Sequence, residues 1–301
     1  MNWQFFLEVL VGGLLAGVMY SLVALGFVLI YKASGVFNFA QGAMVFFAAL
    51  TFVSLIEPRI GMNFWVAIVV TLGVMVVLGI AIERVVLRPL VNQPQITLFM
   101  ATIGLTFVLE GVSQLVWGAQ PHGLELGIPD EPMQWLSANA NINVSQFDVF
   151  AALVAGVLVA VLAVFFQTTR IGRALRAVAD DHQAALAVGI PLRQIWAIVW
   201  TVAGFVALVA GLMWGARNGV QFALTFIALK ALPVLILGGF ESVAGAIVGG
   251  LIIGASEKLA EVYLGPYVGG GIESWFPYVL ALAFLLVRPE GLFGEKRIER
   301  V

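Results

Sequence analysis

Long apolar runs separated by short polar segments dominate the hydrophobic pattern of the chain. A helix that crosses the hydrocarbon core of a bilayer needs about 20 mostly apolar residues. Nine runs are candidates by that measure, and they cover residues 5–30, 36–56, 64–82, 96–118, 149–166, 194–216, 222–237, 242–259 and 272–287. The pattern predicts an all-α, polytopic transmembrane bundle of about nine spans, between eight and ten, within a single domain over residues 1–301.

The runs 222–237 and 242–259 are the weakest candidates in this set. Both are short and rich in glycine, and only four residues separate them. A half-helix or a re-entrant segment at one of the two is the alternative to a full span. Broken helices of this kind are tolerated at membrane depth where they face protein or a water-filled path.

Composition supports lipid as the main solvent of the chain. Of its 301 residues, 61% are hydrophobic and only 11% are charged, whereas soluble domains carry roughly 25% charged residues. The net charge of −2 comes without a basic tract, which argues against a nucleic-acid partner. The sequence has no cysteine, and His122 and His182 lie far apart, so we expect no metal site and no cofactor.

The distribution of lysine and arginine predicts the orientation, because cytoplasmic loops carry an excess of both. With nine spans and a cytoplasmic C-terminus, eleven of the fifteen basic residues lie in the cytoplasm. Three lie outside (Arg59, Arg217 and Lys258), and Lys230 falls within a span. We therefore expect the N-terminus outside and the C-terminus inside. The acidic loop 119–147 then faces the periplasm, and the loop 168–193 faces the cytoplasm.

The cytoplasmic loop has the composition of a short amphipathic helix or helix pair. It begins with three arginines and is rich in alanine and leucine, which are good helix formers. Asp180 and Asp181 are suited to the start of a second helix, and Gly189 followed by Pro191 is suited to its end. Such a surface helix fits a groove on a soluble partner; a plain interfacial connector is the alternative.

Five motifs in order resemble one family of transporters. They are Gly26–Tyr31 with Gly35–Gly42, the run 170–177, the loop Ala179-Asp180-Asp181 with Ala184-Ala185 and Gly189, the segment 235–250, and the tail Arg288–Gly294. Together they are similar to the branched-chain amino-acid permeases of ABC importers, of the LivH type, which are the inner-membrane components of binding-protein-dependent transport systems. Gln41 and Ala43 stand where that family commonly has His and Glu.

The resemblance implies partners and a coupling site. It implies a second, related permease, two cytoplasmic ATPases, a periplasmic binding protein and an amino-acid substrate, in a bacterial inner membrane. The residues that it assigns to contact with the ATPase are Arg173, Arg176, Ala179, Asp180, Asp181, Ala184, Ala185 and Gly189. Leucine, isoleucine and valine are the default substrates; relatives import urea, short amides and aromatic acids. The sequence does not decide whether the second permease is another gene product or an identical copy.

Polar residues inside apolar runs are candidates for the translocation path. Asn38, Gln41 and Gly42 interrupt one run, and Thr102, Thr106 and Glu110 form a stripe at helical spacing on another. In transporters such interruptions usually line the substrate route. The alternative is that these side chains only hydrogen-bond between helices.

Glycines and isolated charges complete the set of candidates. Gly13 with Gly17, Gly238 with Gly239, and Gly245, Gly249 and Gly250 are predicted to pack helices closely. Packing inside one subunit is favoured over a subunit interface. A charge within a span costs about 2.5–3.5 kcal/mol on insertion scales; Lys230 and Glu241 are expected to pair or to mark helix ends, and the role of Glu110 stays open.

Two other classes of function compete with an importer subunit. The sequence contains no GxxxxGK[ST] phosphate loop, so any ATPase must be a separate chain, and this chain is not expected to be an enzyme. A secondary transporter or a channel that works without an ATPase is the main alternative. An intramembrane enzyme is disfavoured, because there is no HExxH motif and no aspartate inside a predicted span.

Overall fold

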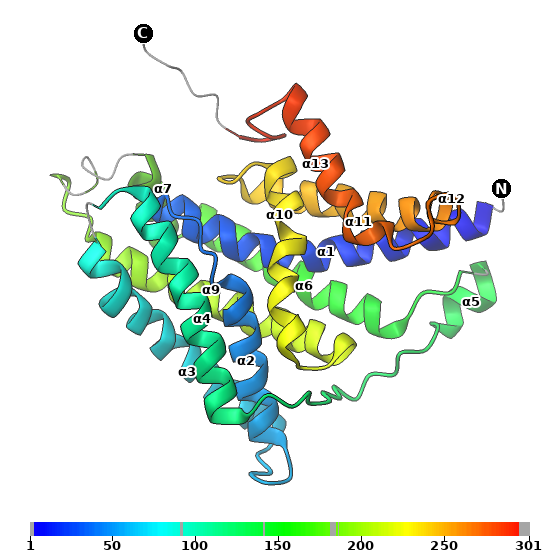
Figure 1. Ribbon diagram of the computed structural model, residues 1–301, viewed down its shortest axis with the longest axis horizontal. Coiled ribbons are helices and arrows are strands. Elements are labelled where there is room, and N and C mark those ends of the chain that lie inside the picture. Colours follow the sequence, from blue (N-terminus) through cyan, green and yellow to red (C-terminus); the bar gives the residue numbers. More distant parts are fainter. Residues whose placement is uncertain (1–2, 91–92, 141, 181–184, 186, 295–301) are drawn as a thin grey trace. The chain divides into compact units, whose positions relative to one another are not determined.

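The computed structural model describes residues 3–90, 93–140, 142–180, 185 and 187–294. Within that part of the chain the regular elements are helical, and no strand occurs (Figure 1). The α-helices are α1 (Trp3–Ser34), α2 (Gln41–Ile56), α3 (Phe64–Ala81), α4 (Gln95–Trp117), α5 (Gln134–Ala140), α6 (Gln146–Thr168), α7 (Arg170–Asp180), α9 (Leu192–Asn218), α10 (Ile227–Gly238), α11 (Val243–Tyr263), α12 (Gly265–Val268) and α13 (Phe276–Val287). Four short elements join them, namely η1 (Ile82–Leu87), η2 (Arg88–Leu90), η3 (Phe222–Phe226) and η4 (Ile272–Ser274). The prediction of an all-α chain is confirmed.

Each of the nine apolar runs contains a helix, but the helices differ in length. In the described residues, six are long and apolar enough to cross a membrane: Trp3–Ser34, Phe64–Leu90, Gln95–Trp117, Gln146–Thr168, Leu192–Asn218 and Val243–Tyr263. The shorter apolar helices are Gln41–Ile56, Phe222–Gly238 and Phe276–Val287. One weak run, 242–259, thus becomes a full-length helix, whereas the other breaks into η3 and α10.

Large apolar side chains remain exposed along α3, α4 and α6. Trp65 and Val77 on α3, Phe107 and Leu115 on α4, and Leu153 on α6 are each more than half exposed. A water-soluble protein of this size rarely leaves so many large apolar groups on its surface. Lipid is the solvent that suits these three helices.

The chain divides into two compact units. Unit 1 consists of residues 1–25, 126–160 and 229–301, and unit 2 of residues 26–125 and 161–228. Two long helices continue from one unit into the other: α1 passes through the division after Leu25, and α6 after Ala160.

In unit 2 the short helix α2 forms the core. It is buried without interruption from Gln41 to Val53, and it contacts α3, α4, α9 and η3. Gly211 of α9 lies against α2, since a Cβ atom there would be 2.7 Å from the Val45 carbonyl oxygen. Gly79 of α3 lies equally close to α9, with the Thr201 amide nitrogen 2.8 Å from the position of its Cβ. Small residues therefore let these backbones approach closely.

In unit 1 the helices α1 and α11 meet along a glycine seam, formed by Gly13 and Gly17 on α1 with Gly250 and Gly254 on α11. A Cβ atom on Gly13 would lie 2.7 Å from the Gly254 carbonyl oxygen, and one on Gly17 would lie 2.5 Å from the Gly250 carbonyl oxygen. The pairing runs in opposite directions along the two helices, which makes them antiparallel.

The C-terminal tail of unit 1 caps the end of α10. The amide of Leu292 donates to the Leu237 carbonyl at 2.8 Å, and the amide of Phe293 donates to the Gly238 carbonyl at 3.1 Å. Gly239, at φ +102°, has no room for a side chain, because the Gly294 amide nitrogen lies 2.9 Å from where its Cβ would be. Two of the five sequence motifs, the glycine-rich segment and the tail, therefore contact each other.

Candidate functional site

The non-helical segment before α2 holds a buried cluster of neutral polar groups. Asn38 and Gln41 are fully buried, and Asn38 Nδ2 donates to Gln41 Oε1 at 3.2 Å. Asn38 Oδ1 accepts from the Ala40 amide at 3.1 Å. The Gln41 side chain fills the space beside Gly26, and its Nε2 atom lies 3.5 Å from the Ala203 carbonyl oxygen.

The stripe on α4 extends this cluster. The buried Thr102 hydroxyl accepts from the Phe39 amide at 3.1 Å, and its single hydrogen is within reach of the Phe99 carbonyl at 2.8 Å and the Phe37 carbonyl at 3.1 Å. Thr106 donates to the Thr102 carbonyl at 3.0 Å. We call Asn38, Gln41, Thr102 and Thr106 the amide cluster. These hydrogen bonds all lie within unit 2, so the cluster fixes the segment before α2 against α4 and α9.

Gly42 and Glu110 lie beside η3 rather than inside the amide cluster. A Cβ on Gly42 would be 2.0 Å from the Thr225 carbonyl oxygen, so no other residue fits there. Glu110 is half-buried on α4, and its side chain lies near that of Thr225. The six residues predicted along the path therefore lie on α2, on the segment before it and on α4, and the two helices contact each other.

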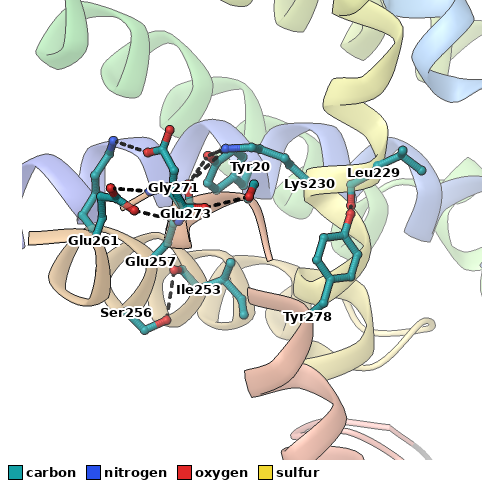
Figure 2. Close-up of polar contacts among 12 residues, drawn as sticks. Tyr20, Leu229, Lys230, Ile253, Ser256, Glu257, Glu261, Gly271, Glu273 and Tyr278 are labelled. Carbon is teal, nitrogen blue, oxygen red and sulfur yellow. Dashed lines mark hydrogen bonds and ion pairs between the residues drawn. The ribbon is translucent and has the colours of Figure 1, made fainter. Parts of the chain in front are cut away.

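A second polar group in unit 1 carries charge. Lys230 of α10 forms an ion pair with Glu257 of α11, with 3.2 Å between Nζ and Oε1. The Tyr20 hydroxyl of α1 donates to the same Glu257 oxygen at 3.1 Å, and Lys230 Nζ lies 3.5 Å from that hydroxyl (Figure 2). We call Tyr20, Lys230 and Glu257 the charged cluster. Lys230 thus pairs with Glu257, a residue that the sequence analysis did not single out.

A proline break in α10 positions Lys230. Pro233 has no amide hydrogen, so the carbonyl four residues earlier, that of Leu229, loses its helical partner. The hydroxyl of Tyr278 on α13 donates to that carbonyl at 2.8 Å (Figure 2). Lys230 directly follows Leu229. The hydrogen bond from Tyr278 to the Leu229 carbonyl therefore also holds the backbone of Lys230 in place.

The position of Glu257 in the cluster follows from the face of α11 on which it lies. Gly250, Gly254 and Glu257 have the spacing of one helix face, as do Gly13, Gly17 and Tyr20 on α1. Long side chains of a helix lean toward its N-terminus, so Tyr20 and Glu257 reach toward each other across the seam. The predicted span 242–259 contained Glu257, and its place on the glycine face is the signal that would have identified it.

Toward the C-terminal end of α11, two more residues, Lys258 and Glu261, make polar contacts with the turn that follows α12. Lys258 Nζ pairs with Glu273 Oε2 at 3.0 Å. Glu261 accepts from the amides of Gly271 and Glu273, each at 3.0 Å (Figure 2). These bonds fasten the turn between α12 and η4 to the end of α11.

The predicted coupling loop contains α7, which is amphipathic and tied to α6. Leu175 and Val178 are buried, and α7 contacts α9. Arg176 Nη1 donates to the Phe166 carbonyl at 2.6 Å, and Arg173 Nη1 donates to the Thr168 carbonyl at 2.9 Å. Both arginines therefore cap the C-terminal end of α6, an arrangement that favours cations.

The other predicted coupling residues are placed only in part. Ala179 is half-buried at the end of α7, Ala185 is buried, and Gly189 adopts a positive φ of 84° in the turn before α9. Asp180 is the last residue of α7. Asp181 and Ala184 lie outside the described residues.

The match to a family model covers almost the whole of this architecture. The model of the branched-chain amino acid transport system / permease component matches residues 9–288. The chain belongs to this permease family.

Full-length relatives agree with that assignment. The permease is 28% identical to the high-affinity branched-chain amino acid transport system permease protein LivH of Salmonella typhimurium, over 100% of this chain and 99% of that protein. It is 28% identical to the corresponding protein BraD of Pseudomonas aeruginosa, over 98% of each. Among solved structures, a chain of PsaBC from Streptococcus pneumoniae in complex with Fab covers 92% of the permease with a TM-score of 0.43 and 15% identity.

The family assignment places the permease in the inner membrane as a multi-pass protein, in agreement with the six long apolar helices among its described residues. The matched residues include the amide cluster, the charged cluster and α7. Both polar clusters are therefore features of the permease domain.

Proposed function

We propose that the permease is the membrane subunit of an ATP-driven importer of branched-chain or related amino acids. The family match over residues 9–288 is the observation that supports this most strongly, and relatives over the full length carry names with the same substrate class. A second permease, identical or related, completes the path. A periplasmic binding protein delivers the amino acid.

The ATPases are separate chains on the cytoplasmic side. No phosphate loop occurs in the sequence, and phosphate loops of that type are how ATPases of this kind hold nucleotide. Orientation follows the distribution of arginine and lysine, with the N-terminus outside and the C-terminus inside. In this topology the loop 168–193, including α7, faces the ATPases.

The corner between α6 and α7 is suited to pass motion from an ATPase into the bundle. Arg173 and Arg176 tie α7 to the last carbonyls of α6. Gly172 lets the two helices touch, since a Cβ there would be 2.1 Å from the Phe166 carbonyl oxygen. A push on α7 is thereby passed to the C-terminal end of α6. Rigid-body rocking of packed helices is a common mode of alternating access.

The path follows the half-exposed part of the α4 stripe. Thr106 and Glu110 are only half-buried, whereas Asn38, Gln41 and Thr102 are buried and hydrogen-bonded. We assign Thr106 and Glu110 to the wall of the path and the buried members to its support.

Single-cysteine labelling tests the orientation, because the natural chain contains no cysteine. Glu125→Cys and Val188→Cys place one thiol in each of the two long loops; Val188 is 76% exposed. A membrane-impermeant maleimide added to intact spheroplasts is expected to label position 125 and to leave position 188 unlabelled until the membrane is opened. The reverse result would overturn the topology.

Uptake by the reconstituted complex tests the function. The permease is purified with its genetic neighbours, and ATP-dependent uptake of labelled leucine, isoleucine and valine is measured in proteoliposomes. Asp180→Lys is expected to abolish both uptake and retention of the ATPase, with membrane insertion intact. Glu125→Lys, the same charge reversal in the other loop, is expected to retain the ATPase. Uptake that persists without ATP or ATPase would support a secondary transporter or channel instead.

A further inference from the structure

We propose that the charged cluster is a binding site for the zwitterionic head of an α-amino acid. In this inference, which rests on the proposed function, Lys230 binds the substrate carboxylate and Glu257 binds the substrate ammonium. Without substrate the two side chains neutralise each other. With substrate, each exchanges its partner for an opposite charge on the ligand.

The lysine is accessible and has a hydrogen-bond donor to spare. Its ammonium group carries three donors, of which two are used by Glu257 Oε1 and the Tyr20 hydroxyl. About a third of its side chain, 34%, is left uncovered by the chain. A carboxylate can therefore approach Lys230 without displacing the packing around the glycine seam.

The glutamate has an oxygen without a partner. Its side chain is 2% exposed, yet Glu257 Oε2 is buried with no hydrogen bond in the described part of the chain. Buried polar atoms are rarely left in this state, and each one calls for an explanation. A substrate ammonium that reaches Oε2 as the pair opens would satisfy it.

The surroundings match a ligand site better than a purely structural ion pair. Lys230 lies on α10, where the internal Pro233 removes one helical hydrogen bond beside the lysine. Intramembrane charges mark substrate pathways by default. The exchange leaves the net charge of the cluster plus ligand at zero in both states, so no unpaired charge has to enter the apolar bundle.

The test compares two neutralised ion pairs on α11. In Lys230→Gln/Glu257→Gln both charges of the cluster are removed together, and in Lys258→Gln/Glu273→Gln the neighbouring pair is removed as a matched control. Both variants are expected to assemble with the ATPases. The first is expected to lower maximal ATP-driven leucine uptake about tenfold or more, because hydrogen bonds to charged groups are lost, and the control is expected to stay within about twofold of the natural chain.

A charge-swapped variant, Lys230→Glu/Glu257→Lys, separates binding from mere attraction between helices. It keeps the ion pair but moves each charge to the other helix, and we expect assembly without restored uptake. Wild-type uptake in either the doubly neutral or the swapped variant would overturn the site while leaving the proposed function intact. Failure of both variants to assemble would show a structural pair and would also overturn the site. Absence of amino-acid uptake by the natural complex would instead reject the proposed function.

Discussion

The amide cluster of unit 2 and the charged cluster of unit 1 differ in charge and in how fully their hydrogen-bonding groups are satisfied. Asn38 and Gln41 are neutral, fully buried and bonded to each other. Lys230 and Glu257 are charged, and the pair leaves one acceptor of Glu257 unsatisfied and part of Lys230 uncovered. Asn38 lies in the segment that connects α1 to α2, and Lys230 lies on α10, a helix that contains Pro233.

The difference indicates that the amide cluster supports the helix packing, whereas the charged cluster is able to bind a ligand. A satisfied neutral network fixes one arrangement of its helices and gains little from a ligand. A charged pair with spare capacity is more costly in an apolar environment and has more to gain from a partner of opposite charge. The comparison therefore predicts that mutations in the first cluster change stability more than transport, and that the reverse holds for balanced changes in the second.

The largest expected effect comes from separating the helices that hold the charged cluster. Gly17→Val would place a Cβ 2.5 Å from the Gly250 carbonyl oxygen, a contact between backbones that no rotamer relieves. We expect a loss of at least about 3 kcal/mol in the free energy of unfolding, at the upper end of overpacking costs, measured by titration with sodium dodecyl sulfate. Gly12→Val is the control with the same helix propensity, because nothing lies within 4 Å of its Cβ position. Equal losses in the two variants would contradict the seam.

A smaller loss follows from leaving one charge of the cluster alone. Glu257→Leu strands the Lys230 ammonium, and removing one partner of a buried pair costs about 3–5 kcal/mol. Because 34% of the Lys230 side chain is uncovered, we expect about 2 kcal/mol, measured by the same titration.

Lys230→Met/Glu257→Leu should recover most of that stability, since a neutral pair leaves no charge unpaired. A double variant as unstable as the single one would mean that Glu257 acts through contacts other than Lys230.

The helices that hold the charged cluster are predicted from the sequence, whereas their contacts are predicted only in part. Each apolar run contains a helix, because the length of an apolar run is a local property of the sequence, whereas the short helices α5 and α12 lie outside the runs. The glycine spacing predicts which faces pack closely; Gly13 lies against Gly254, and Gly17 lies against Gly250. The glycine spacing alone does not predict the hydrogen bond between Tyr20 and Glu257, because that contact depends on the antiparallel direction of the two helices.

Pairing between distant residues is what the sequence leaves undetermined. From the sequence, Lys230 and Glu241 are expected to pair or to mark helix ends. The structure pairs Lys230 with Glu257, 27 residues away, across a packed interface. Likewise, Tyr278 repairs the break at Pro233 from a separate helix. Tertiary contacts of this kind depend on helix rotation, which hydrophobic periodicity constrains only to within a broad face.

The amide cluster gives the next smaller effect. Asn38→Leu removes the bonds to Gln41 and to the Ala40 amide, and an unsatisfied buried group costs about 1–3 kcal/mol. We expect a loss of about 1.5 kcal/mol. In a double-mutant cycle with Gln41→Leu, a coupling energy of about 0.5 kcal/mol or more would identify the pair as one network, whereas strict additivity would separate the two residues. Leucine uptake per assembled complex should stay close to that of the natural chain.

The smallest expected effect comes from the second ion pair of α11, between Lys258 and Glu273, in comparison with the pair between Lys230 and Glu257. Lys258 pairs with Glu273 at 3.0 Å, slightly closer than Lys230 to Glu257, but the side chains of Lys258 and Glu273 are 35% and 40% exposed. Burial of the acid, rather than distance, is the difference between the two pairs, because the two lysines are almost equally exposed. Lys258→Ala should therefore lower the free energy of unfolding by less than about 1 kcal/mol, as for ion pairs open to solvent, and the loss should shrink further as salt is added. A loss as large as that of Glu257→Leu would mean that α11 is far more shielded at Lys258 than the exposure of the pair implies, and the contrast between the two ion pairs would no longer hold.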